Sequence, residues 1–263
     1  MQLGISTASF FRKILTESCF AKLAEMGVKN TEVFLSSYSE TDPGFADALA
    51  EKKGDINVHS IHALAIQFEE QLFSKAQRVR DDAETYFRRA LYVGNVLGAR
   101  YYTFHGPLVL IKSIEQMPIE RYAEIMNGLA DIADNYGMFV AQENVHYCYS
   151  NNPEFFKMLL RLCPKIKTTL DIKHALISGY DPIAFLDAMG DRLVTIHAVD
   201  VDKEGAPRLP GKGRYNFERL FKEIEARKQI INPAVLIEGY ARNFSSIDEL
   251  EESYEYLHKI LSK

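Results

Sequence analysis

The sequence of 263 residues is poor in cysteine and has no long uninterrupted apolar run. Its three cysteines, Cys19, Cys148 and Cys163, are odd in number and form no C-x-x-C pair, which argues against a disulfide framework and predicts reduced thiols. No apolar span is long enough to cross a bilayer, and the first residues lead into a strand-like run without a charged and then apolar leader. We therefore expect a cytoplasmic protein that does not enter membranes.

The sequence also lacks an excess of positive charge. It contains 31 basic and 36 acidic side chains, scattered along the chain, for a formal net charge of −5. No basic stripe is present to neutralise a phosphate backbone, so nucleic acid is not expected as a partner. The run Ser-Thr-Ala-Ser-Phe at residues 6–10 is not the glycine-rich fingerprint that holds phosphates in open doubly wound sheets.

What the sequence does contain is a regular alternation of strand-like and helical segments. Short runs rich in β-branched and aromatic residues predict eight strands, at 2–9, 31–35, 56–62, 101–105, 138–144, 166–171, 193–199 and 234–239. Amphipathic segments predict eight helices, at 17–26, 43–53, 74–97, 118–136, 153–162, 182–190, 217–228 and 246–261. This alternation favours a single-domain (β/α)8 TIM barrel over residues 1–263, a chain length that suits the fold.

Several of the predicted strands end in a carboxylate or an imidazole, and these residues are His62, His105, Glu143, Asp171, His197 and Glu238. In a parallel barrel the carboxyl ends of all strands meet at one mouth, where active sites lie. Carboxylates buried side by side are costly without a counter-charge, which a divalent cation supplies. We therefore predict one divalent metal ion, with a ligand set made of Glu143, Asp171, His197 and Glu238. Three carboxylates and one imidazole suit Mn²⁺, Mg²⁺ or Co²⁺ and tolerate Zn²⁺.

The same stretches resemble the xylose isomerase-like TIM-barrel family, which contains sugar and sugar-phosphate isomerases and epimerases, inosose dehydratase-type lyases and the endonuclease IV group. The matching stretches follow the family's order along nearly the whole chain and are His62-Ala63, Phe104-His105, Glu143-Asn144, Asp171-Ile172-Lys173-His174, His197 with Asp200, Pro210-Gly211-Lys212-Gly213 and Glu238. The resemblance implies that the same four residues bind one divalent metal in an isomerase-type site, and that His174 and Arg208 bind substrate. His62 and His105 are further candidates for substrate binding, with a hydrogen-bonded core position as the alternative. Members of the family frequently associate, so the resemblance also implies a homo-oligomer.

One loop departs from the family's endonucleases, which hold three zinc ions and need an Asp-x-His pair after strand seven. Residues 200–213 contain Asp200, Asp202 and Arg208 but no histidine. The third metal of a zinc nuclease is therefore not expected. Together with the acidic net charge, this difference favours a small-molecule sugar or sugar phosphate as substrate over abasic DNA.

The predicted ligand set suggests a mechanism. A polyol ketone held through adjacent carbonyl and hydroxyl oxygens would have its carbonyl polarised by the metal, which stabilises the enediolate formed on deprotonation. Glu143 and Glu238 lie on non-adjacent predicted strands and are expected to be catalytic, one removing a proton and the other returning it. We therefore predict a metal-dependent sugar or sugar-phosphate isomerase or epimerase that acts through a metal-bound enediolate.

Three other functions stay open at this point. The same site could dehydrate inosose or a related keto-polyol, could cut abasic DNA as an endonuclease IV-like zinc nuclease, or could bind a sugar without turnover. Some individual residues are open as well. Asp200 either orients His197 or is a solvated loop carboxylate, Glu32 could reach the mouth from strand two, and His146 is near the site only by sequence adjacency.

Overall fold

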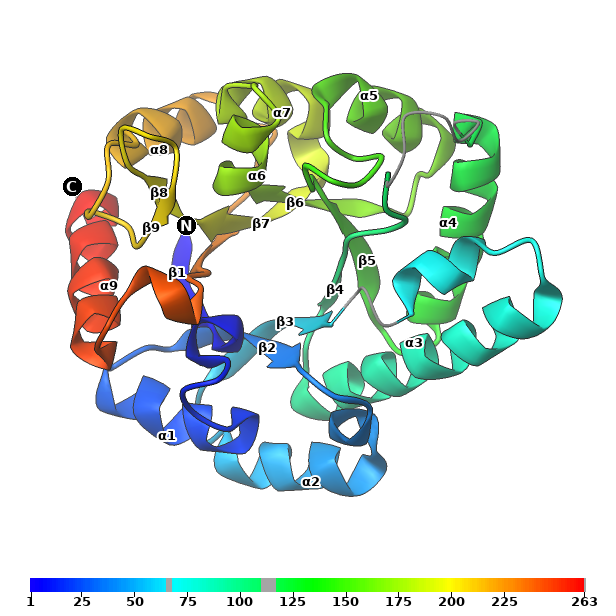
Figure 1. Cartoon of the computed structure of the whole chain (residues 1–263), viewed down its shortest axis with the longest axis horizontal. Helices are drawn as coiled ribbons and strands as arrows, with labels where there is room; N and C mark the ends of the chain where they lie inside the picture. The colour runs from blue at the N-terminus through cyan, green and yellow to red at the C-terminus, as the bar shows by residue number, and fades with distance from the viewer. Residues whose placement is uncertain (65–67, 110–116, 263) are drawn as a thin grey trace.

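The computed structural model describes residues 1–64, 68–109 and 117–262, and it is a closed ring of strands surrounded by helices (Figure 1). The order of hydrogen-bonded neighbours around the ring is β1-β10-β7-β6-β5-β4-β3-β2, and all of these pairs are parallel. The ring closes because β1 pairs with β2 on one side and with β10 on the other. The predicted single-domain (β/α)8 barrel is therefore confirmed.

The barrel strands and the helices alternate along the described chain. The barrel strands are β1 (Gln2–Ser6), β2 (Asn30–Leu35), β3 (Asn57–Ala63), β4 (Tyr101–Phe104), β5 (Phe139–Glu143), β6 (Lys167–Asp171), β7 (Leu193–Ala198) and β10 (Ala234–Ile237). The α-helices are α1 (Thr16–Glu25), α2 (Pro43–Lys52), α3 (Gln77–Leu97), α4 (Ile119–Asp134), α5 (Pro153–Leu162), α6 (Ile172–Ile177), α7 (Pro182–Met189), α8 (Phe217–Ala226) and α9 (Ile247–Leu261). Between β7 and α8, the strands β8 (Asp200–Val201) and β9 (Pro207–Arg208) form a short antiparallel ribbon.

The strands form where the sequence provides short apolar runs, and the helices form where apolar residues recur on one face. Leu170, Ile196 and Leu236, from three neighbouring strands, are fully buried, as expected for parallel strands that are covered on both sides. In α3, Phe87 and Leu91 are spaced by one helical turn and are also fully buried. The helices therefore cover the outside of the barrel, and the loops after the strands surround its mouth.

The first strand is shorter than the sequence predicted. β1 ends at Ser6, whose side-chain oxygen accepts a hydrogen bond from Ala8 N at 3.3 Å, and the chain turns there into the 3-10 helix η1 (Thr7–Phe10). The long helix predicted from residue 74 begins at Gln77. Both differences arise at element ends, where a local cap or turn decides the boundary.

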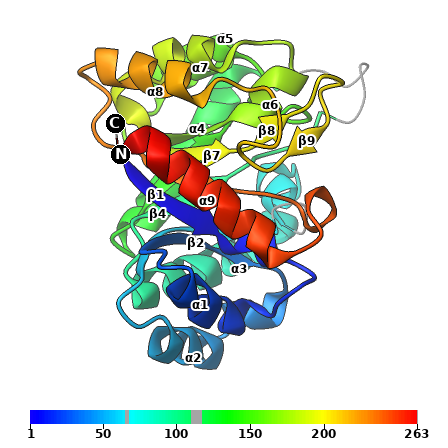
Figure 2. The ribbon, with the colours of Figure 1, turned by 90° about the vertical axis from the view of Figure 1, so that its left-hand side faces the viewer.

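A helix that the sequence did not predict follows β6 directly. This helix, α6, is capped by Asp171, whose Oδ1 accepts a hydrogen bond from His174 N at 2.7 Å. The same aspartate therefore ends the strand, caps the helix and reaches the barrel mouth. Figure 2 shows the β8–β9 ribbon on the side of the molecule toward which β1 runs from the N-terminus, so this loop borders the same mouth.

The three cysteines, Cys19, Cys148 and Cys163, are buried and form no disulfide. Burial raises the pKa of the Cys19 thiol to about 12, so this thiol stays protonated at neutral pH. Within the described residues, none of the helices combines the length and the apolar composition that crossing a membrane requires.

Candidate functional site

Four buried side chains meet at the mouth of the barrel, and they are the four that the sequence suggested as metal ligands. Glu143 ends β5, Asp171 ends β6, His197 lies on β7, and Glu238 directly follows β10. One ligand atom from each of them lies within 4.8 Å of the others. They meet because β5, β6, β7 and β10 are consecutive neighbours in the barrel, although they lie far apart in the sequence.

The imidazole of His197 lies at the centre of this cluster. Its Nδ1 is 3.1 Å from Glu143 Oε1 and 3.5 Å from Glu238 Oε2. Its Nε2 is 3.2 Å from Oε1 of Glu32, a residue on β2 across the barrel. A proton on Nε2 would face the Glu32 carboxylate and leave the Nδ1 lone pair free to bind a metal beside the two glutamates.

Glu32 is a site residue for which the sequence left the role open. Its side chain is fully buried and accepts hydrogen bonds from three hydroxyl groups, those of Ser6 at 3.0 Å, Ser60 at 2.8 Å and Thr103 at 2.6 Å. The pairing of β2 with β3 shifts register between Thr31 and Glu32, an irregularity of the kind that redirects side chains next to active sites. Glu32 is therefore the residue that supports His197 from behind.

Asp200, the other residue considered for supporting His197, has a different place in the structure. It is buried, and its two carboxylate oxygens accept four backbone N–H bonds, from Val201, Gly211, Gly213 and Tyr215, at 2.8 to 3.0 Å. Both earlier interpretations of Asp200 were thus wrong, because it is neither directed at His197 nor solvated. It holds the loop after β7 in shape.

The donor set fits a divalent cation. Three buried carboxylates and an imidazole within a few ångströms of one another need a positive charge, and Oδ2 of Asp171 is buried without a hydrogen-bond partner among the described residues. The same is true of Nδ1 of His62, which faces the Glu238 carboxylate of the cluster at 3.5 Å. Unused buried ligand atoms that converge are expected where an ion completes the site.

Electrostatic interactions within the cluster change the pKa values of its members. Burial alone would lower the pKa of His197, but the Glu238, Glu32 and Glu143 carboxylates raise it well above its usual value. Burial alone would raise the pKa of Glu143, but the imidazoles of His197 and His105 hold it well below its usual range. Without a metal, protons on the histidines therefore compensate the carboxylates, and metal binding is expected to release those protons.

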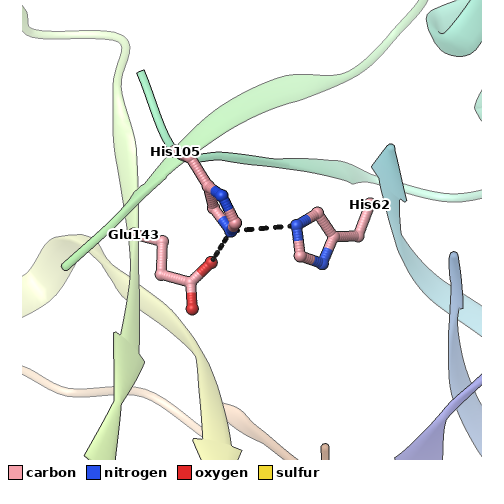
Figure 3. Close-up of side chains that lie close together, drawn as sticks. All are labelled: His62, His105 and Glu143. Carbon is pink, nitrogen blue, oxygen red and sulfur yellow. Dashed lines mark hydrogen bonds and ion pairs between the residues drawn. The ribbon is translucent and has the colours of Figure 1, made fainter. Parts of the chain in front are cut away.

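His62 and His105 lie beside the four ligands rather than in a separate part of the core. Figure 3 shows the two rings pointing toward one another, with His105 Nε2 lying 3.0 Å from His62 Nε2 and 3.0 Å from Glu143 Oε2. On its other side, His62 Nδ1 is 3.5 Å from Glu238 Oε1. His62, His105 and Glu143 also place one ligand atom each within 4.8 Å of one another, so this trio is a second group that could hold a metal.

A cavity of about 180 Å³ opens beside the cluster. Its polar lining comes from His62, His105, His174 and Glu238, and its aromatic walls come from Phe11, Phe34, Tyr147 and Tyr240. Polar groups grouped at one end of an apolar-walled cavity are typical of sites for small polar molecules. Three of the four residues that were predicted to bind substrate, all of them histidines, therefore line one cavity.

His174 is paired with His146, which the sequence had placed near the site by adjacency alone. The Nδ1 atoms of the two rings lie 2.6 Å apart, and the rings stack with centroids separated by 4.7 Å. Burial, with a further contribution from the Lys173 ammonium, holds the pKa of His174 well below its usual value. A neutral His174 that accepts a hydrogen bond from His146 at Nδ1 keeps its own proton on Nε2.

Arg208, the fourth predicted substrate ligand, is not brought to the cavity in this structure. It lies on β9, its side chain is 43% exposed, and its Nη2 is 2.7 Å from Asp202 Oδ2. The ribbon therefore holds Arg208 at the rim of the mouth, paired with a carboxylate of the same loop. Its predicted role in substrate binding remains a prediction.

Lys173 is a residue of the cluster to which the sequence analysis gave no role. It lies in the first turn of α6 with only 2% of its surface exposed, and its Nζ is 3.3 Å from Asp171 Oδ2. Burial alone would lower the pKa of Lys173, but the Asp171 and Glu238 carboxylates raise it above its usual value, so the side chain is an ammonium. Its signal in the sequence is a lysine between Ile172 and His174, two residues after a strand end that carries a carboxylate.

Comparison with known proteins agrees with this architecture. The family model described as xylose isomerase-like TIM barrel matches residues 20–260, and the chain therefore belongs to that family. A search among curated proteins finds no significant match.

Solved structures with the same fold are similar over the whole chain. A D-tagatose 3-epimerase-like protein is 19% identical, with a TM-score of 0.79 and coverage of 100% of this chain and 97% of its own. A D-psicose 3-epimerase from Clostridium cellulolyticum H10, solved with D-tagatose, is 15% identical, with a TM-score of 0.80 and coverage of 99% of both chains. The IOLI protein, solved with a bound zinc atom, is 18% identical, with a TM-score of 0.80 and coverage of 100% and 98%. At these identities the similarity establishes the fold.

Proposed function

We propose that this protein is a metal-dependent sugar or sugar-phosphate isomerase or epimerase. The observation that carries the proposal is the convergence of Glu143, Asp171, His197 and Glu238 beside a cavity with aromatic walls. The family and the similar structures of a D-tagatose 3-epimerase-like protein and a D-psicose 3-epimerase support the same class of reaction. The cavity, about 180 Å³, is smaller than the pockets of roughly 300 Å³ or more that hold drug-sized ligands, and this suits a monosaccharide.

The four converging residues would hold one divalent ion, Mn²⁺, Mg²⁺, Co²⁺ or Zn²⁺. When bound, this ion supplies the positive charge that polarises a substrate carbonyl and acidifies the neighbouring C–H. His197 and Asp171 would serve only as metal ligands and would not transfer protons. Each is fixed from behind, His197 by the Glu32 carboxylate and Asp171 by the His174 N–H that it accepts at the start of α6.

Glu143 and Glu238 are proposed as the residues that move the proton. They approach Nδ1 of His197 from β5 and from the end of β10, which lie on either side of β7 in the barrel order. Glu238 borders the cavity and is placed to take a proton from a substrate carbon, while Glu143 returns one from the other side. Return to the opposite face of the same carbon gives an epimer, and transfer to the next carbon gives an isomer.

His62, His105 and His174 are proposed to bind the oxygen atoms of the substrate, because all three line the cavity. The pairing of His174 with His146 leaves Nε2–H of His174 as a donor to a hydroxyl or carbonyl oxygen. Arg208 would bind an anionic group of the substrate only after releasing Asp202. The substrate is therefore proposed to be a neutral ketose or its phosphate, with the histidines as its first contacts.

The test of this proposal combines metal analysis of the purified protein with a panel of ketoses and ketose phosphates in D₂O. We expect deuterium to appear at the carbon next to the carbonyl, together with an epimer or isomer in the NMR spectrum. Exchange should disappear after chelation and return when a divalent metal is added back. Absence of exchange for every ketose with the metal-loaded protein would overturn the proposal.

Variants of the two glutamates test their roles directly. Glu143→Gln and Glu238→Gln should each reduce formation of the epimer or isomer by about 100-fold or more, because a general acid or base contributes about that much. Glu25→Gln is the matched control, since Glu25 is an exposed glutamate that pairs with Lys22 on α1. Full formation of the epimer or isomer in Glu143→Gln or Glu238→Gln would remove that residue from the mechanism.

The same experiments separate the alternatives. A dehydratase acting on inosose or another keto-polyol would give a product that has lost a hydroxyl, which the NMR spectra would reveal. A sugar-binding barrel would bind metal and sugar without any exchange. A zinc nuclease would nick an abasic-site duplex; this outcome is disfavoured because the loop of residues 200–213 has no histidine and uses Asp200 to bind its own backbone.

A further inference from the structure

A fully buried lysine inside a group of metal-ligand carboxylates needs a physical explanation. Lys173 Nζ lies 3.3 Å from Asp171 Oδ2 and 4.0 Å from Glu238 Oε2. It also donates a hydrogen bond to the hydroxyl of Tyr240 at 2.7 Å, and it lies 4.4 Å from the centre of that ring. Charged lysines are rarely buried unless they are paired. Lys173 is paired with Asp171 and Glu238, which are two of the three carboxylates in the proposed metal site.

The position of Lys173 points to the ligands rather than to the substrate. Lys173 does not line the cavity, whereas Tyr240 and Glu238 do, so its ammonium is shielded from a bound sugar by its own partners. The Asp171 oxygen that it approaches is the one that has no hydrogen-bond partner in the described part of the chain. Lys173 therefore lies next to the free ligand atom that a metal would use.

The charges of the site lead to the same interpretation. Glu143, Asp171 and Glu238, together with Glu32 beside His197, place four carboxylates in this region, and the Lys173 ammonium lies within 4.0 Å of two of them. Before a metal binds, the ammonium is the permanent cation beside Asp171 and Glu238. After a metal binds, two cations share the same carboxylates at short range and repel one another.

We propose that Lys173 is a built-in cation of the metal site, which holds Asp171 and Glu238 in the metal-free protein and weakens the binding of the divalent ion. The inference rests on the proposed metal site. Tyr240 provides the ammonium with a partner that is not a metal ligand, so Lys173 can turn toward Tyr240 when the carboxylates bind an ion. The residue thus sets metal affinity and makes the ion easier to exchange.

The test compares neutral variants of Lys173 with the wild type by titration calorimetry with Mn²⁺ at a single pH. Lys173→Met and Lys173→Gln should both bind Mn²⁺ about tenfold more tightly, or better, because the repulsion between like charges is removed. Their metal-free forms should melt at a lower temperature than the wild type, and the rise in Tm on adding Mn²⁺ should be larger. Lys165→Met is the matched control, because Lys165 is an exposed lysine that also pairs with two carboxylates, those of Asp131 and Asp134.

A variant of Tyr240 is expected to change the Mn²⁺ affinity in the opposite direction. Tyr240→Phe removes the hydroxyl partner of Lys173, leaves the ammonium to the carboxylates, and should weaken Mn²⁺ binding by about threefold, the effect of one hydrogen bond. Unchanged or weaker Mn²⁺ binding in both neutral Lys173 variants would overturn the inference. If the affinity changes are as predicted but no ketose proton is exchanged, the inference stands and the proposed activity is refuted. If neither the wild type nor any variant binds Mn²⁺, the inference is refuted together with the proposed metal site.

Discussion

Two buried aspartates follow neighbouring strands of the barrel, and the structure uses their oxygen atoms differently. Asp171 ends β6, and Asp200 begins the ribbon just after β7. Both oxygens of Asp200 accept backbone N–H groups, four in total. Asp171 accepts one backbone N–H through Oδ1, while its Oδ2 has no hydrogen-bond partner among the described residues and faces Lys173.

The comparison shows which feature distinguishes a carboxylate that stabilises its own loop from one that can still bind a metal ion. Burial and residue type are the same for the two, so neither distinguishes them. Asp200 is enclosed by its own loop so closely that a Cβ on Gly213 would lie 2.3 Å from Asp200 Oδ1, which explains the glycine there. Asp171 keeps one oxygen that accepts no hydrogen bond from the described residues, beside the Lys173 ammonium, at a site where three other potential ligands converge.

Replacing Asp171 should give the largest effect and is the most direct way to break the comparison. Asp171→Asn removes the free anionic oxygen but keeps the Oδ1 acceptor that caps α6, so we expect metal affinity to fall by about 100-fold. Lys173 keeps Tyr240 and Glu238 as partners, so metal-free stability should change less than in Asp200→Asn. Titration calorimetry with Mn²⁺ measures the first quantity and urea unfolding in chelator the second; wild-type metal affinity would show that Asp171 is no ligand.

The opposite result is expected for Asp200. In Asp200→Asn an amide group replaces one of the two accepting oxygens and faces backbone N–H donors, which are left without an acceptor. We expect the free energy of unfolding to fall by about 2 kcal/mol. Metal affinity should stay within about threefold of the wild-type value, because Asp200 touches none of the four ligands. A large loss of metal affinity in a folded Asp200→Asn protein would contradict the structural role.

A third prediction concerns the pH dependence of stability, which the histidines of the metal-ligand cluster are expected to control. Burial alone would lower the pKa of His62, but the Glu238 and Glu32 carboxylates raise it from 6.5 to about 10. Because the folded-state value is the higher one, the stabilisation is fully present below pH 6.5 and is lost as the pH rises through about 10. His197 is shifted in the same direction. The Tm of the chelated protein should therefore fall over this range, whereas that of the metal-loaded protein should stay nearly constant; equal pH profiles for both forms would contradict the cluster electrostatics.

The smallest expected effect is that of replacing His146, the ring partner of His174. His146→Phe keeps the stacked ring but removes the ring nitrogen that pairs with His174, so His174 Nδ1 is left with the longer 3.4 Å bond from the His146 backbone N–H to fix its proton on Nε2. We expect KM to rise by about threefold with kcat and metal affinity unchanged. Steady-state kinetics on the substrate identified in the ketose panel measures this, and an unchanged KM would show that the pair does not orient His174.

The barrel itself could be predicted because its signals are local and repeated. Each apolar run is short, each helical segment has one apolar face, and together they repeat eight times in a chain of suitable length. The ends of elements were harder, since they depend on single side-chain contacts. Ser6 ends β1 by accepting Ala8 N, and Asp171 starts α6 by accepting His174 N.

The candidate site was only partly predictable. The positions of the four suggested ligands followed from strand ends alone, because parallel strands deliver their last residues to one mouth. The support of His197 by Glu32 depends on a register shift in β2, and the place of Arg208 depends on a ribbon closed by the Asp200 carboxylate. Neither feature leaves a periodic signal in the sequence.

By itself, the amino-acid sequence determined which ionisable groups end the barrel strands and therefore which of them could meet. Only the tertiary structure decided how those groups pair: that Glu32 faces His197, that Lys173 is buried against Asp171, and that Asp200 is used by its own loop. The physical reason is that strand ends follow from local patterns in the sequence. Whether a given oxygen or nitrogen has a hydrogen-bond partner depends on the positions of all its neighbours in space, and these are often more than 50 residues away in the sequence, as for His197 and Glu143.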